Sequence, residues 1–278
     1  MNETKIAFKA VTKTILKTKL TESKSIQSVI HYITAFLAIC VAPLVLLTAC
    51  GNDDPADLDD KITFATSSMY PPFEFHAQGE LQGLDIDIAK AVAKELGREA
   101  IFEDMQFGAV LAAIQSGQAD AGIATMTITD ERKQSFDFSE PYYFETMAAV
   151  FDVHMPINEI ADMDGKRIVC QLGTTMEFWL KQQHFVSAEI VTMDSPNQAI
   201  EAVKSGQADV AFLDGAQSAI FSQNNPELAY KTLITSKDGY GIVVRKGSDL
   251  LEQINSALAT LEGKGELNKI KTKWLGDE

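Results

Sequence analysis

Residues 122–143, GIATMTITDERKQSFDFSEPYY, hold the densest group of side chains that could bind a charged ligand. An uncharged apolar run ends in the hydroxyls of Thr127 and Thr129, and Arg132 follows shortly after them. A guanidinium close to hydroxyls and to the free N–H groups of a helix start can bind a carboxylate through paired, charge-assisted hydrogen bonds. The structural alternative is that Thr129 caps the helix and Arg132 is a solvated surface charge.

Strand and helix patterns alternate along the chain around this run. In the first half we expect strands at 61–66, 99–105 and 119–126, and helices at 84–96 and 108–116. After an extended apolar segment at 144–153 we expect strands at 166–172, 188–193, 208–214 and 240–245, with helices near 173–183, 197–205, 216–221 and 249–261 and a last helix that carries Trp274. This alternation predicts an α/β fold with mainly parallel sheets and helices on both faces.

A short internal repeat indicates that the chain has two similar halves. The sequence SGQAD occurs at 116–120 and again at 205–209, each time after an amphipathic helix and before an apolar strand. The strand after the first copy ends near Thr125 and Thr127, and the strand after the second copy ends in Asp214. Because open parallel sheets bind ligands beyond the carboxyl ends of their strands, two facing halves would bring these groups to one cleft.

We therefore expect two Rossmann-like lobes joined by a two-stranded hinge. Lobe one is predicted to comprise 61–146 plus 240–278, and lobe two 150–236. The chain would cross between them near 146–150 and again near 237–240. Two lobes on such a hinge can close around a ligand.

The first 60 residues predict export. Residues 1–49 combine a Lys-rich start with an apolar, uncharged run from 29 to 49, and Leu-Thr-Ala precedes Cys50. This pattern resembles a bacterial lipoprotein signal peptide, in which Cys50 would be the lipidated residue. The acidic segment 50–60 is expected to be a flexible tether. Two alternatives are that the apolar run, which is long enough to span a bilayer, remains uncleaved, and that the true start is a later codon. In each case the rest of the chain is extracytoplasmic, and the signal predicts a lipid anchor in a bacterial membrane.

Composition and motif content argue against several classes of function. The net charge of −15 disfavours a nucleic-acid partner. If Cys40 leaves with the signal and Cys50 carries lipid, Cys170 has no disulfide partner, and its apolar strand predicts a buried, inert thiol. We find no metal-ligand spacing, nucleophile motif or phosphate loop, so we expect no catalytic residue, metal or cofactor.

The chain resembles the extracytoplasmic solute-binding proteins of polar amino-acid ABC importers, the group of the lysine/arginine/ornithine-, glutamine- and arginine-binding proteins. The resemblance rests on YPPFEF, GLDIDIAKAVAKELG, MTITDERKQSFDFSEPYY, LGTT and KSGQADVAFLD, and it extends from Lys61 to Leu275. It implies a type II periplasmic-binding-protein fold that holds an α-amino acid between its lobes.

The resemblance also implies a role for individual residues at the two charged ends of the ligand. Arg132 would bind the α-carboxylate, assisted by Thr127 from lobe one and Thr175 from lobe two. Asp214 would pair with the α-ammonium, together with the backbone carbonyl of Thr125. Opposite charges at a fixed spacing would discriminate an amino acid from a plain acid or amine.

Other matching positions would contact the ligand side chain. Tyr70 and Phe107 match an aromatic pair that encloses it, although both could simply pack in the core, and Gln171 could hydrogen-bond a guanidinium or an amide. Basic- and glutamine-binding members have an acidic residue three positions before the Tyr70 position, where this chain has Ser67. The expected ligand is a polar or basic L-amino acid, with arginine favoured.

The resemblance implies a monomer that delivers the amino acid to an ABC permease and ATPase complex. The alternative is a cleft enzyme of the same fold, such as a cyclohexadienyl (prephenate/arogenate) dehydratase. Glu74, Glu140 and Glu177 are conceivable acids, but none is paired with a base at recognisable spacing. A receptor module of this fold would be fused to a membrane or signalling domain, and we expect a free-standing protein instead.

Overall fold

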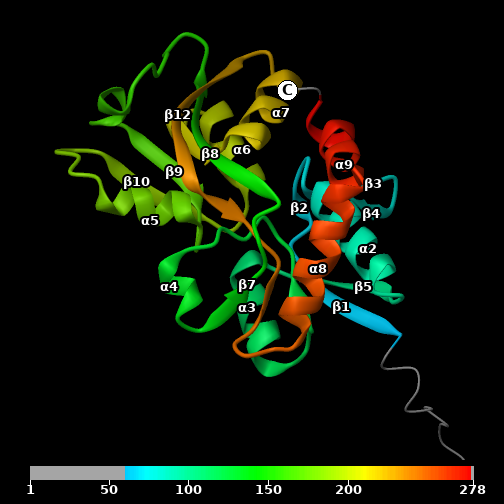
Figure 1. Ribbon diagram of the computed structural model, residues 1–278. Coiled ribbons are helices and arrows are strands. Elements are labelled where there is room, and N and C mark those ends of the chain that lie inside the picture. The colour runs from blue at the N-terminus through cyan, green and yellow to red at the C-terminus, as the bar shows by residue number, and fades with distance from the viewer. Residues whose placement is uncertain (1–59, 277–278) are drawn as a thin grey trace, which may run out of the picture. The chain divides into compact units, whose positions relative to one another are not determined.

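The structure is a computed structural model that describes residues 60–276 (Figure 1). The expected signal peptide, the lipidated Cys50 and the tether up to residue 59 lie outside the described residues. Among residues 60–276, we find no helix with the length and apolar character needed to cross a membrane.

The first lobe is built on a five-stranded sheet of order β5-β1-β6-β13-β7. Its strands are β1 Lys61–Thr66, β5 Glu99–Asp104, β6 Ala121–Gly122, β7 Phe136–Phe138 and β13 Val243–Arg245. A three-stranded sheet follows β1 in the sequence and consists of β2 Met69–Tyr70, β3 Glu74–Ala77 and β4 Glu80–Gln82. The helices are α2 Leu84–Glu95, α3 Phe107–Ser116, α4 Asp130–Lys133, α8 Leu250–Gly263 and α9 Glu266–Leu275.

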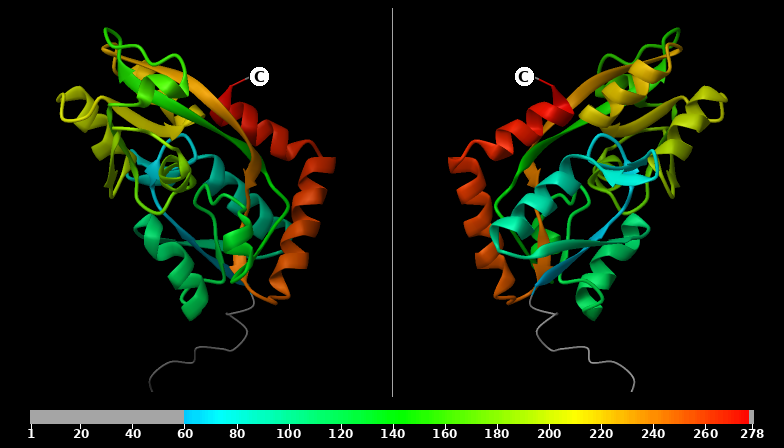
Figure 2. Two further views of the ribbon diagram at one scale, coloured as in Figure 1. Left: turned by 90° about the vertical axis from the view of Figure 1, so that its left-hand side faces the viewer. Right: turned by 90° about the vertical axis from the view of Figure 1, so that its right-hand side faces the viewer.

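Alternating side chains of β1 cover the two faces of this sheet, as the period of a strand requires. Ile62 and Phe64 pack against the apolar stripe of α2 and against α8, and Ala65 packs on the other face against α3. Figure 2 shows α8 and α9 running beside α2, which both of them contact.

The second lobe is built on a sheet of order β10-β9-β11-β8-β12. Its strands are β8 Tyr143–Asp152, β9 Arg167–Gln171, β10 Glu189–Met193, β11 Val210–Asp214 and β12 Leu228–Tyr240. Its helices are α5 Thr175–Gln182, α6 Pro196–Lys204 and α7 Gly215–Asn224, with a 3₁₀ turn at Ile160–Met163. Ile168 packs with α5 on one face, and Val169 packs with α6 and α7 on the other.

Both sheets are mixed rather than mainly parallel. β1 pairs in parallel with β5 and β6, and β9 pairs in parallel with β10 and β11. The remaining pairs, β13 with β6 and β7 and β8 with β11 and β12, are antiparallel. The antiparallel pairs arise where the chain passes between the lobes and must return in the opposite direction.

The strand β12 was not predicted from the sequence. Its residues mix apolar and polar types and many are exposed, so they lack the regular apolar alternation that marks a strand. The strand forms because it pairs along β8, from Leu228 opposite Asp152 to Tyr240 opposite Tyr143, and the two strands run side by side in Figure 1. This pairing joins residues that are 76 to 97 positions apart in the sequence, and it includes irregularities between Thr232 and Ile234 and between Thr235 and Gly239.

The two SGQAD repeats have matching structures, as the sequence predicted. Gly117 ends α3 with a φ of 79° and Gly206 follows α6 with a φ of 71°, both left-handed conformations that favour glycine. In each repeat the aspartate accepts a hydrogen bond from a strand backbone: Asp120 from the N–H of Thr63, and Asp209 from the N–H of Arg167, both at 2.8 Å. The repeat therefore closes the helix and fixes it to the sheet in each lobe.

Candidate functional site

Seven of the eight predicted binding residues line one small cavity of about 10 Å³. They come from both lobes and are Tyr70, Phe107, Thr125, Thr127, Arg132, Gln171 and Thr175. The eighth residue, Asp214, lies directly behind the cavity wall, since its Oδ2 accepts a hydrogen bond of 2.8 Å from Tyr240, which lines the cavity. The fold thus brings the predicted cation and the predicted anion to the same place.

Arg132 spans the two lobes from the short helix α4. Its Nη1 donates to the carbonyl of Thr127 at 2.8 Å, and its Nη2 donates to the carbonyl of Gly173 at 3.1 Å. Thr129 caps α4 by accepting from the backbone N–H of Arg132 at 3.2 Å, as the structural alternative for Thr129 predicted. Arg132 is not a solvated surface charge, however: it is partly buried, its guanidinium carbon lies 5.9 Å from the Phe107 ring centre, and burial lowers its pKa.

Two threonine hydroxyls, one from each lobe, converge on a carboxylate that the sequence did not single out. The Thr127 hydroxyl donates to Oε2 of Glu145 at 2.7 Å, and the Thr175 hydroxyl donates to Oε1 at 2.8 Å. The two hydroxyl oxygens are 3.3 Å apart. Glu145 lies on β8 and is fully buried, and this burial raises its pKa to about 7. A lone acid in the apolar run FETMAAVF was the available sequence signal.

Asp214 occupies the junction between β11 and α7. Its Oδ1 accepts from the backbone N–H groups of Ala216 at 2.8 Å and Gln217 at 3.2 Å, so it caps α7. Its other oxygen accepts from Tyr240. Burial raises the pKa of Asp214 to about 6, and these hydrogen bonds oppose that shift. Asp214 is therefore a rigidly held anion at neutral pH, suited to an ammonium group.

Thr125 has a left-handed backbone, with a φ of 46°, which is unusual for a β-branched residue. Its N–H donates to Oδ2 of Asp85 at 2.7 Å, and Asp85 also accepts from the Tyr142 hydroxyl at 2.9 Å. The strand expected over 119–126 consequently ends early, at Gly122, and the chain turns toward the cavity. Asp85 was another acid that sequence reasoning missed, although it lies among the apolar residues of α2.

Asp85 and Glu74 form a buried pair of acids behind Thr125. Burial raises the pKa of Asp85 to about 7 and that of Glu74 well above its usual range, and the neighbouring Asp85 raises the pKa of Glu74 further. One oxygen of each, Oε2 of Glu74 and Oδ1 of Asp85, has no hydrogen-bond partner among the described residues. The buried Ser67 hydroxyl is likewise without a partner within 60–276.

Protonation of Asp85 predicts a pH-dependent stability. Its pKa rises from 3.8 to about 7 on folding, so its contribution is fully present below pH 3.8 and is lost as the pH rises to about 7. Asp85→Asn mimics the protonated acid, and we expect it to flatten the fall in unfolding free energy across this range, which is on the order of 4 kcal/mol for such a shift. Urea unfolding at pH 4.5, 6 and 7.5 measures this, with the exposed Glu103→Gln as control. Equal slopes in Asp85→Asn and the native chain would contradict it.

The remaining predicted residues combine site and packing contacts. Tyr70 is 8% exposed and lies 6.1 Å, ring centre to ring centre, from Phe73, so it belongs both to the cavity wall and to the core. Gln171 donates from Nε2 to the carbonyl of Asp194 at 3.4 Å. Thr174 caps α5 by accepting from the backbone N–H of Glu177 at 3.4 Å, which leaves the neighbouring Thr175 hydroxyl to face Glu145.

A larger pocket of about 530 Å³ adjoins the small cavity. It shares Phe107, Arg132 and Thr175 with the cavity and adds apolar walls from both lobes, including Met147 and Trp179. A ligand that entered here would reach Arg132 and Thr175 first.

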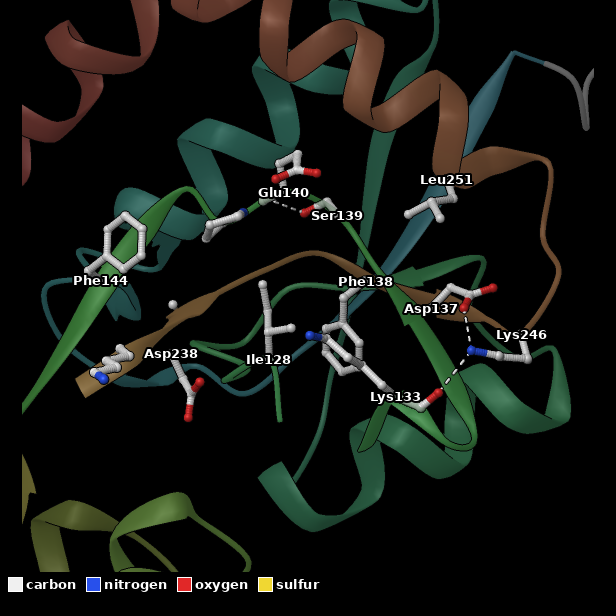
Figure 3. A pocket seen from close by; sticks show the side chains of 13 residues that line it. Ile128, Lys133, Asp137, Phe138, Ser139, Glu140, Phe144, Asp238, Lys246 and Leu251 are labelled. Carbon is white, nitrogen blue, oxygen red and sulfur yellow. Dashed lines mark hydrogen bonds and ion pairs between the residues drawn. The ribbon is translucent and has the colours of Figure 1, made fainter. Parts of the chain in front are cut away.

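A third pocket, of about 400 Å³, lies away from the predicted residues (Figure 3). Its Lys246 pairs with Asp137 at 2.7 Å and donates to the carbonyl of Lys133 at 2.8 Å, and this pairing lowers the pKa of Asp137. The Lys246 and Asp137 side chains therefore satisfy each other's charge within this pocket. It shares none of the eight predicted residues.

Comparison with protein families yields a match over nearly all of the described chain. The sequence profile of the bacterial extracellular solute-binding proteins, family 3, matches residues 62–167 and 173–277. The arginine-binding extracellular protein ArtP of Bacillus subtilis is 31% identical over 256 residues, which cover 89% of this chain and 98% of that protein.

Further relatives include a protein named for another ligand. The L-cystine-binding protein TcyJ of Escherichia coli is 32% identical over 212 residues, covering 74% of this chain and 79% of that protein. Among solved structures, an ancestral arginine-binding protein bound to arginine has a TM-score of 0.75 and 37% identity, covering 78% of this chain and 99% of that chain. The family match includes strands of both five-stranded sheets.

Proposed function

Because the chain belongs to family 3 of the bacterial extracellular solute-binding proteins, we propose that its cavity captures an α-amino acid for an ABC importer. The observation that carries this proposal is the placement of Arg132 and Asp214 at one cavity, each supplied by a different lobe. A zwitterion presents opposite charges at a fixed separation, and such a site binds it better than a plain acid or amine. The homologues are binding components of ABC amino-acid transporters, which supports the same role here.

The roles of the site residues follow from their chemistry. Arg132 offers a planar fork of donors for the α-carboxylate, and Thr127 and Thr175 add hydroxyl donors. Asp214 accepts from the α-ammonium, together with the carbonyl of Thr125. Tyr70, Phe107 and Gln171 contact the side chain of the amino acid.

Arginine is the ligand that we favour within the polar and basic amino acids. Ser67 removes the acid that basic-ligand relatives have at that position, but Glu74, Asp85, Glu145 and Asp214 are all buried in or behind the cavity wall. Asp214 stays ionised at neutral pH and Glu145 is ionised in part, so the free cavity attracts a ligand with an added positive charge. Relatives named for arginine support this choice.

Membership of the family places the protein outside the cytoplasm, and the family's role is transport. We propose that the protein binds its ligand without chemical conversion, that it is a monomer and that lipid on Cys50 anchors it. We also propose lobe boundaries at 61–146 plus 240–278 and 150–236, with the hinge near 146–150 and 237–240, where β8 and β12 pass between the two sheets.

The cavity is much smaller than an amino acid, so we expect the lobes to separate before binding and to close over the ligand. A thermal-shift screen of the twenty amino acids plus ornithine, citrulline and cystine tests the proposed function. A ligand that binds only the folded protein stabilises it by about 2.7 kcal/mol at a hundredfold excess over its dissociation constant. We expect the largest shift with arginine; no shift with any amino acid would contradict the proposal.

Incubation with prephenate tests the enzymatic alternative in the same preparation. We expect prephenate to remain unchanged beyond its spontaneous decay. Protein-dependent formation of product would replace the transport role with a dehydratase.

A further inference from the structure

Glu145 holds the hydroxyls that an amino acid would need. The Thr127 and Thr175 hydroxyls each donate to one of its two oxygens, at 2.7 and 2.8 Å. A hydroxyl has a single proton to donate. Neither threonine can therefore donate to Glu145 and to a ligand carboxylate at the same time.

The position of Glu145 makes it a tethered counterpart of a ligand carboxylate. It projects from β8, is fully buried, and bridges a hydroxyl of the first lobe to a hydroxyl of the second. The nearby guanidinium of Arg132 is engaged with the backbone carbonyls of Thr127 and Gly173. Glu145 thus links the two lobes through the same groups that would link them through the ligand.

We propose that Glu145 competes with the ligand carboxylate for Thr127 and Thr175, and that it takes up a proton from solvent when an amino acid binds. This inference rests on the proposed function. Two carboxylates in one buried site disfavour each other's ionisation, so the arrival of the second favours the neutral form of the first. A neutral Glu145 is a weaker acceptor for the two hydroxyls, and it has a proton of its own to donate to the ligand.

The groups around Glu145 set the pH range of this exchange. Burial and the charge of Asp214 at the end of β11 favour its neutral form, whereas the hydrogen bonds from Thr127 and Thr175 and the charge of Arg132 on α4 favour its ionised form. Tyr70 on β2 and Tyr240 on β12 also face it, and burial with nearby acids raises the pKa of both, so they stay neutral. With a pKa of about 7, Glu145 is largely ionised at pH 8 and must then gain most of one proton on binding.

The competition also affects how well the site discriminates between an amino acid and the corresponding amine. Arginine carries the competing carboxylate, whereas agmatine, its decarboxylated amine, does not. Ionised Glu145 therefore weakens arginine binding and leaves agmatine binding unopposed. Glu145 is therefore a specificity-determining residue. It lowers the ratio of the affinity for arginine to the affinity for agmatine, most strongly at alkaline pH.

Isothermal titration calorimetry on the native chain and Glu145→Gln tests this inference. Arginine and agmatine are titrated at pH 8 in buffers that differ in ionisation enthalpy, and the difference in heat gives the number of protons taken up. We expect the native chain to take up close to one proton with arginine and none with agmatine. We expect Glu145→Gln to take up none and to bind arginine about tenfold more tightly at pH 8, the cost of neutralising a group of pKa about 7.

Glu140→Gln is the matched control, since it removes the same charge from an exposed residue five positions earlier. It should leave both proton uptake and affinity unchanged. Arginine binding by the native chain without proton uptake overturns the inference, and this measurement does not depend on any variant folding. Failure of both the native chain and Glu145→Gln to bind any amino acid would instead remove the proposed function on which the inference rests.

Discussion

Replacement of Arg132 by alanine should weaken arginine binding at least about thirtyfold and leave the fold intact. Arg132 provides the only guanidinium that lines the cavity, among the residues that the structure describes, and its loss leaves a buried carboxylate without its counter-charge. Removing one partner of a buried charge pair costs about 2–5 kcal/mol, and each 1.4 kcal/mol is a factor of ten in affinity. In the free protein its partners are two backbone carbonyls at the cavity, which water can satisfy.

Calorimetry with arginine measures the loss, and circular dichroism with a thermal melt verifies the fold. Lys133→Ala is the control, because Lys133 is the next residue of α4, carries the same charge and is exposed. It should bind arginine as the native chain does. Unchanged affinity in Arg132→Ala would exclude Arg132 from the site.

Asp214→Asn should cause a loss of similar size at the other end of the ligand. An asparagine oxygen can still accept from the backbone N–H groups of Ala216 and Gln217, so the cap of α7 is kept. Its amide cannot supply the negative charge that the α-ammonium needs, and the expected cost is again about 2–5 kcal/mol. The substitution therefore separates the capping role of Asp214 from its proposed binding role.

The pH dependence of arginine binding provides a second test of the binding role of Asp214. Its pKa of about 6 means that affinity for arginine should fall as the pH falls below 6, because protonation removes the charge. Glu145 acts in the opposite direction above pH 7, so the native chain should bind arginine best between about pH 6 and pH 7.

In Asp214→Asn the loss of affinity below pH 6 should disappear, whereas in Asp130→Asn it should persist. Asp130 is a suitable control because its side chain is fully exposed on α4. If Asp214→Asn keeps native affinity, the α-ammonium is held elsewhere.

Local sequence determined much of the secondary structure of the protein. Helix α2 was evident from apolar spacing, and Gly117 and Gly206 marked the ends of α3 and α6 because only glycine enters a left-handed conformation without strain. Polar residues at strand ends, Thr127 and Asp214, also pointed to the shared cavity, since the ends of parallel strands meet at one edge of a sheet.

Only the tertiary structure decided the pairing of the strands and the burial of the acids, because both depend on contacts between distant residues that no local pattern encodes. Strand β12, which has no regular apolar alternation, forms through its pairing with β8, and these two strands make the second sheet mixed. The same long-range packing buries Asp85 and Glu145 and raises the pKa of both to about 7. An isolated acid in a sequence has no fixed solvation, so whether it is a surface charge or a buried proton-binding group is set only when the lobes assemble around it.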